Sequence, residues 1–120
     1  MSGAEIPGVD PVVPPSGTGC AECLAGAGAG WWFHLRRCAQ CGHVGCCDSS
    51  PSQHSRAHFA ETGHPVVQSF EPREDWFWSW PDEAFLAGPP LAEPTSHPAD
   101  QPVPGPAGRV PSDWMRRLNS

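Results

Sequence analysis

The distribution of apolar residues predicts a small mixed domain in the middle of the chain. Residues 31–37 (WWFHLRR) carry an apolar side chain at every second position, which is typical of a strand with one buried face. Residues 65–70 (PVVQSF) and 76–80 (WFWSW) predict two further strands, which are joined by the polar turn EPRED.

Residues 51–62 have the boundary signals of a helix. Ser50 is a suitable N-cap residue, Gln53 completes a capping box with it, and Gly63 is a typical terminator. After the last predicted strand, the sequence of residues 81–86 (PDEAFL) predicts one short helical turn. The expected fold is α+β, with a few antiparallel strands packed on one main helix.

The chain has 16 proline and 13 glycine residues among its 120 residues. They are concentrated at its two ends, together with other small residues. Such segments bury too little apolar area to offset their ordering entropy. We therefore expect a disordered segment at residues 1–19, a domain at residues 20–86, and a disordered Pro-rich tail at residues 87–120 in which a short C-terminal helix can form. A domain this small usually needs a disulfide or a metal to stabilise it.

The charge balance excludes the common polyanion-binding classes. The chain has 7 basic residues, all arginine, against 13 acidic ones, for a net charge of −6, whereas nucleic-acid binding needs clustered positive charge. No apolar run approaches the ~20 residues of a membrane span, and no secretory leader is visible. We expect a stand-alone, monomeric, cytoplasmic protein of bacterial composition, in which cysteines are more often metal ligands than disulfides.

Cysteine and histidine residues follow a metal-ligand spacing. Two CxxC pairs are followed by a further cysteine and three histidines, which gives eight ligands and therefore two tetrahedral zinc sites. Buried cysteines with surface histidines, or a disulfide framework, are the alternatives, and the latter leaves the histidine spacing unexplained. The ligands are Cys20, Cys23, Cys38, Cys41, Cys46, His54, His58 and His64.

The same count argues against catalysis. Eight protein ligands leave neither zinc the open position that a catalytic metal needs. The helical segment HSRAH also lacks the glutamate that serves as general base in HExxH enzymes. A non-enzymatic role is therefore favoured over a metalloenzyme such as a deaminase or peptidase.

The motifs CxxC, CGHVGC, HSRAH and TGHP, followed by an aromatic strand, resemble the UBP-type zinc finger over about residues 20–85. This ubiquitin-binding module is found in ubiquitin-specific proteases and in a cytoplasmic histone deacetylase. The resemblance implies interleaved sites: Cys20, Cys23, Cys46 and His54 at one zinc, and Cys38, Cys41, His58 and His64 at the other.

Three residues near the ligands have no assigned place. Cys47 is adjacent to Cys46 and either sulfur could reach the metal; Cys46 fills the motif position and is preferred. His34 and His43 are interpreted as supporting or surface groups. Some family members bind a third zinc through a CxxC in the aromatic strand, and WFWSW has no cysteine.

The family also suggests a peptide site. Its aromatic pocket holds the free C-terminal Gly-Gly of ubiquitin, and Trp78, Trp80 and Phe85 stand where the family places its aromatic residues; the alternative is that these rings form the core. The family's carboxylate-binding arginine is replaced here by Asp48, so we expect weak or undetectable binding of ubiquitin's tail. Arg36 or Arg37 is a candidate substitute.

The leading hypothesis is a zinc-binding module that recognises a protein or peptide C-terminus. The alternative is a redox- or zinc-responsive switch, because thiolate-rich sites release metal when they are oxidised.

Overall fold

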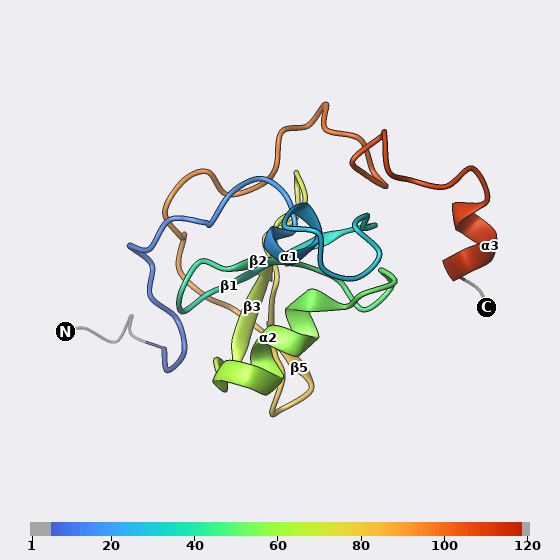
Figure 1. Ribbon diagram of the computed structural model, residues 1–120. Coiled ribbons are helices and arrows are strands. Elements are labelled where there is room, and N and C mark those ends of the chain that lie inside the picture. Colours follow the sequence, from blue (N-terminus) through green and yellow to red (C-terminus); the bar gives the residue numbers. More distant parts are fainter. Residues whose placement is uncertain (1–5, 119–120) are drawn as a thin grey trace.

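The computed structural model describes residues 6–118 and has one antiparallel five-stranded sheet in the order β2-β1-β3-β4-β5. Within these residues three helices accompany it, with α2 on the sheet and α3 near the C-terminus (Figure 1). This arrangement confirms the expected α+β class. The elements are α1 Ala21–Leu24, β1 Leu35–Cys38, β2 Val44–Cys46, α2 His54–Thr62, β3 Val66–Ser69, β4 Phe77–Ser79, β5 Ala84–Leu86 and α3 Trp114–Leu118.

The strands are shorter than the apolar pattern suggested. Within residues 31–37 only the second half belongs to β1, while Trp31 and Trp32 are both buried. The central strand β3 is buried at all four positions, and β1 and β4 flank it on either side. In and around β4 the expected alternation is present: Phe77 is buried, whereas the neighbouring Trp76 and Trp78 are half-buried.

The main helix begins later than the capping signals predicted. Its first residue is His54, and the preceding Gln53 takes a left-handed conformation (φ 51°) without a side-chain cap. The Ser50 hydroxyl instead accepts a hydrogen bond of 2.8 Å from the backbone N–H of Phe33. The hydroxyl that was expected to cap the helix thus binds a residue that is distant in the sequence. The predicted helix start at residue 51 is wrong, because α2 begins at His54. The predicted end is right: Gly63 adopts φ 77°, which glycine tolerates best.

Residues 81–86 were also predicted incorrectly, since they end in the strand β5 and not in a helical turn. Phe85 of β5 stands opposite Trp78 of β4. Six residues are too few for a periodic signal, and the open edge of β4 supplies hydrogen-bonding partners that the local sequence does not reveal. The strand β2 was also not predicted, because three residues are too few for a periodic signal and they lie inside the ligand motif CGHVGC.

The helix α2 is not held by an apolar stripe. Ser55 is its buried residue, and Ala57, Ala60 and Glu61 are exposed. Its close approach to β2 depends on Gly45, where an added Cβ would lie 2.8 Å from the backbone nitrogen of Ser55. Because propensity alone rarely stabilises a helix of this length, the histidines of α2 and what they bind must fix its position.

In the part of the chain that the structure describes, the buried apolar side chains form two small clusters. One contains Trp32, Leu35, Val44 and Phe70 together with three cysteine side chains. The other contains Ala39, Val66, Phe77 and Leu91, with Val9 and Leu86 packed at its margin. Both are small for a stable domain, as the length of the chain led us to expect.

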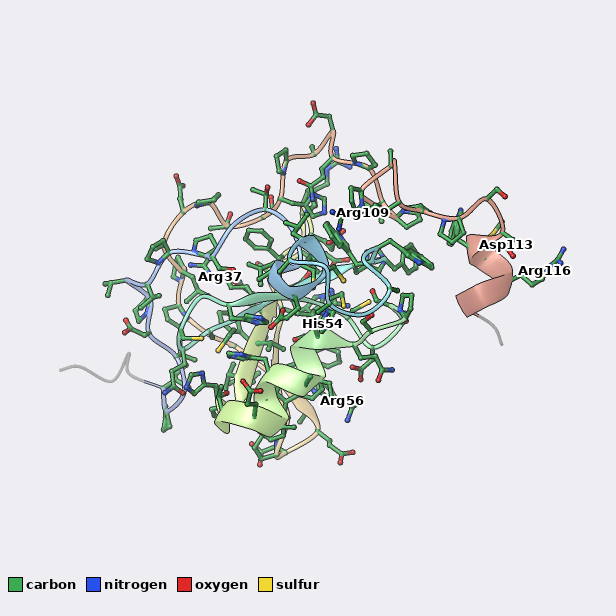
Figure 2. The ribbon with its side chains drawn as sticks, viewed as in Figure 1. Arg37, His54, Arg56, Arg109, Asp113 and Arg116 are labelled. Carbon is green, nitrogen blue, oxygen red and sulfur yellow. The ribbon has the colours of Figure 1, made fainter. Side chains whose placement is uncertain are left out.

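Segments near both chain ends form hydrogen bonds with the domain. Arg37 is 1% exposed, and its guanidinium donates hydrogen bonds of 2.8 Å to the carbonyl of Val13 and 3.1 Å to the carbonyl of Pro94. Near the C-terminus, Arg109 donates to the carbonyl of Cys23 at 2.8 Å (Figure 2). The division at residues 20–86 stays a prediction. No helix within residues 6–118 is long and apolar enough to cross a bilayer.

A buried carboxylate ties the sheet to the C-terminal segment. Glu71 is 6% exposed, and its oxygens accept from the Leu35 backbone N–H at 2.9 Å and contact His34 Nδ1 at 3.1 Å and His97 Nε2 at 2.9 Å. Burial alone raises the pKa of Glu71, but the interactions with both histidines and with the Leu35 N–H outweigh burial and lower this pKa. The charged form is therefore the one that stabilises the fold.

Replacing Glu71 by Gln should lower the free energy of unfolding by about 1.5–3 kcal/mol at pH 7, since hydrogen bonds to a charged group are lost. A depressed folded-state pKa contributes stability that is fully present above the unfolded pKa of about 4.3 and is lost as the pH falls through the folded value. The difference between wild type and variant should therefore shrink on acidification. Urea unfolding in excess zinc measures it, with Glu61→Gln on an exposed face as the control; a difference that grew at low pH would contradict this account.

Candidate metal centres and aromatic pocket

The first candidate metal centre joins the start of the domain to the start of α2. The Nδ1 atom of His54 lies 3.2 Å from Cys20 Sγ, 3.4 Å from Cys23 Sγ and 3.5 Å from Cys46 Sγ. The three cysteines are buried and His54 is half-buried, and Figure 2 shows His54 at the end of α2 nearest α1.

These distances fit a tetrahedral zinc ion. Zn–S bonds of about 2.3 Å and Zn–N bonds of about 2.0–2.1 Å at tetrahedral angles separate sulfur from nitrogen by about 3.6 Å. The observed separations are slightly shorter, so the four donor atoms already surround a volume of the right size.

The protonation of the thiols supports the same conclusion. Hydrogen bonds with Cys23 and Cys46 lower the pKa of Cys20, whereas the hydrogen bond with Cys20 raises the pKa of Cys23 to about 11. The pKa of Cys46 is raised by its hydrogen bonds with the other two thiols. Without a cation the cluster therefore favours one thiolate, and a divalent metal is what allows three.

The second candidate centre is more open. Cys38 Sγ lies 3.6 Å from His64 Nδ1, and Cys41 Sγ lies 3.3 Å from His58 Nε2. Cys38 is buried, both histidines are half-buried, and Cys41 is exposed. Burial, followed by the nearby His43 and His64, lowers the pKa of His58 to about 4, so its imidazole is neutral, which is the form that binds zinc. Within residues 6–118 these two groups are the Cys/His clusters that fit a metal, and the chain has two zinc sites.

Cys46 and Cys47 point to different surroundings. Besides its contact with His54 Nδ1, the Cys46 sulfur accepts the His54 backbone N–H at 3.2 Å. The Cys47 sulfur lies outside the cluster, is buried, and contacts the Ser50 hydroxyl at 3.5 Å. Cys46 ends β2, and successive side chains along an extended backbone point to opposite sides. Which of the two neighbouring thiols faces the metal centre could therefore not be predicted from the sequence.

The two clusters are connected through His43. Its Nε2 contacts both carboxylate oxygens of Glu22, at 2.8 and 2.9 Å, and its ring stacks on His58 with centroids 4.1 Å apart. Glu22 lies in α1 between Cys20 and Cys23. His43 therefore orients one ligand of the second cluster against the helix that carries the first, a link that sequence reasoning left open.

A pocket of about 210 Å³ opens between β4–β5 and the start of α2. Phe85 and Trp78 meet edge to face at 5.0 Å, and Phe85 is 66% exposed. The pocket brings together all four candidate peptide-binding residues, Arg36, Trp78, Trp80 and Phe85. Its full lining is Arg36, Cys47, Asp48, Ser49, Arg56, Val67, Trp76, Trp78, Trp80 and Phe85.

Each of the two arginines of this pocket lies over a tryptophan ring. The guanidinium of Arg36 lies 4.6 Å from the Trp76 ring centroid, and that of Arg56 lies 5.1 Å from the Trp80 centroid. Arg56 also donates from Nε to the Asp48 carboxylate at 3.1 Å, and the hydrogen bond and charge of Asp48 raise the pKa of Arg56. Arg37, the other proposed substitute for the family's arginine, lies away from the pocket in its bonds to both chain ends (Figure 2).

Arg56 is a charged pocket residue that the sequence analysis did not name. It lies between His54 and His58 in α2 and therefore on another face of the helix. Its place beside Trp80 follows from the docking of α2, where Phe59 stacks on Trp80 with centroids 5.8 Å apart. No local pattern in the sequence signals this approach.

Comparisons with known proteins agree with this geometry. The family described as "Zn-finger in ubiquitin-hydrolases and other protein" matches residues 20–91, which is more than half of the chain. The solution NMR structure of protein RPA1320 from Rhodopseudomonas palustris is similar, with 43% sequence identity, coverage of 78% of this chain and 85% of that chain, and a TM-score of 0.58. No curated protein matches the chain.

Proposed function

Because the chain belongs to the zinc-finger family of ubiquitin hydrolases and other proteins, we propose that it is a protein-interaction module whose aromatic pocket binds the C-terminal end of a peptide. The eight candidate zinc ligands Cys20, Cys23, Cys46, His54, Cys38, Cys41, His58 and His64 serve structure, and they leave no metal position open for catalysis. We expect the module to act as a monomer in the cytoplasm, where cysteines remain reduced.

The observation that carries this proposal is the gathering of half-buried tryptophan rings around one open pocket. Trp76, Trp78 and Trp80 would pack more deeply if they served only the core, yet each stays half-buried and lines the same pocket. Exposed aromatic residues in a concave site are typical binding anchors. The volume of about 210 Å³ is below the ~300–1,000 Å³ usual for small-molecule sites, which suits the end of a peptide chain.

Replacing Phe85 by Ala should weaken binding of a peptide that ends in Gly-Gly by about tenfold or more, since a central aromatic contact is removed. Titration of the zinc-loaded protein, followed by tryptophan fluorescence and calorimetry, measures the effect. Phe85 is largely exposed, so the variant should keep its fold and both zinc ions.

Met115→Ala is the matched control, because Met115 is 64% exposed and lies in α3 outside the pocket. It should bind the peptide as wild type does. Equal affinity of wild type and Phe85→Ala, or no binding by wild type, would refute the proposed function for this class of peptide.

A zinc- or redox-responsive switch is the second candidate, and one observation favours it. Cys41 is exposed within the second cluster, whereas all three cysteines of the first cluster are buried. Oxidants and chelators therefore reach the second zinc more easily.

A further inference from the structure

Arg36 stands apart from the other charged residues of the pocket. Asp48 and Arg56 form an ion pair with each other, whereas Arg36 forms none with any residue in the described range 6–118. Its guanidinium donates one hydrogen bond, of 3.0 Å, to the carbonyl of Leu35. Four of its five N–H donors thus remain for a ligand or water.

The register of the sheet places Arg36 at one end of the pocket. In β1 it stands opposite Ser69 of β3, whose backbone N–H donates to the carbonyl of Trp76. These three residues form a row across the sheet. Trp80, beside the Asp48–Arg56 pair, is four residues further along the chain, about 13 Å away in an extended strand.

The two ends of the pocket therefore differ in what they can bind. A ligand carboxylate near Trp80 meets Arg56 already paired and Asp48 carrying a like charge. Near Trp76 it meets the guanidinium of Arg36, which has no ion-pair partner among residues 6–118 and lies 4.6 Å from the indole ring centroid. The planar donors of a guanidinium suit bidentate binding of a carboxylate.

We propose that Arg36 is the residue that binds the free carboxylate of the peptide, in place of position 48. The C-terminus then lies at the Trp76 end, and the preceding residues cross Trp78 and Phe85 toward Trp80. This assignment rests on the proposed function, and it adds the direction of the bound chain and the residue that selects a free chain end.

The test compares two forms of one peptide, free of Asp and Glu and ending in Gly-Gly, with either a free carboxylate or a C-terminal amide. Calorimetry measures both affinities for wild type, Arg36→Met and Arg56→Met, each loaded with two zinc ions. Wild type should bind the acid about 10- to 100-fold more tightly than the amide, the usual contribution of a charge-assisted hydrogen bond. Arg36→Met should bind both forms equally, whereas Arg56→Met should keep the preference.

The other outcomes are distinguishable. A preference that survives in Arg36→Met and disappears in Arg56→Met would place the carboxylate at the opposite end and overturn the assignment. Equal binding of acid and amide by wild type would also overturn it, while leaving peptide binding in the pocket intact. Absence of binding for both forms would overturn the proposed function and this inference together. Zinc analysis and circular dichroism of each variant exclude a folding defect as the cause.

Discussion

Removal of both zinc ions by a strong chelator should unfold the domain, with loss of the near-ultraviolet circular dichroism of its tryptophans and of dispersed amide signals in NMR spectra. The physical reason is the small size of the two apolar clusters and the composition of the first, in which Cys20, Cys23 and Cys46 are members. The helix α2 buries little besides Ser55, so its histidines are its principal attachment. Metal-binding energy is here folding energy.

Zinc should leave in two steps, because the centres differ in exposure. The centre with Cys41 should release its ion first under limiting chelator or mild peroxide, and the buried centre with Cys20 should follow. Metal analysis of the intact protein should give two zinc ions per chain. A folded protein in excess chelator would contradict the dependence of the fold on zinc, and simultaneous release would argue against a selective switch at the second centre.

Cys46→Ser should lose one zinc ion and destabilise the domain strongly, whereas Cys47→Ser should keep both ions. The Cys46 sulfur lies with the donors of the first centre and also accepts the first backbone N–H of α2. The Cys47 sulfur contacts the Ser50 hydroxyl, and Cys47 is among the residues that line the aromatic pocket. The two substitutions change the same atoms in neighbouring residues, so each serves as the control for the other.

Metal content by mass spectrometry under native conditions, together with thermal unfolding, reads out this pair. Loss of zinc from Cys47→Ser with retention in Cys46→Ser would mean that the neighbouring thiol is the ligand. Loss from both would mean that Cys47 supports the centre indirectly, through the turn that precedes α2.

The structure changes the charge argument about Asp48. Taken alone, an aspartate at the position of the family's arginine predicts repulsion of a ligand carboxylate. Asp48 instead pairs with Arg56, so much of its charge is compensated inside the pocket. Repulsion by Asp48 was the reason to expect weak or undetectable binding of ubiquitin's tail. Because that charge is compensated by Arg56, we propose instead that a chain end in Gly-Gly binds measurably, through Arg36.

The sequence alone determined the zinc chemistry of this protein, because the metal imposes a fixed donor set and the chain must supply it at recognisable spacings. The family and the two sites could be predicted from CxxC, CGHVGC, HSRAH and TGHP, and the α+β class from the apolar pattern and the boundary signals of the main helix. The end of α2 could be predicted as well, because the left-handed conformation that ends the helix is a local property of Gly63 and needs no distant contact.

Tertiary structure decided what depends on contacts between distant segments. Residues 84–86 form a strand because β4 offers them an edge, and Ser50 is drawn from its capping role by Phe33. Arg36 and Arg37 are neighbours in one strand, yet strand alternation sends one to the pocket and buries the other under both chain ends. Two adjacent arginines are equivalent in the sequence, and only the faces of the folded sheet give them different roles.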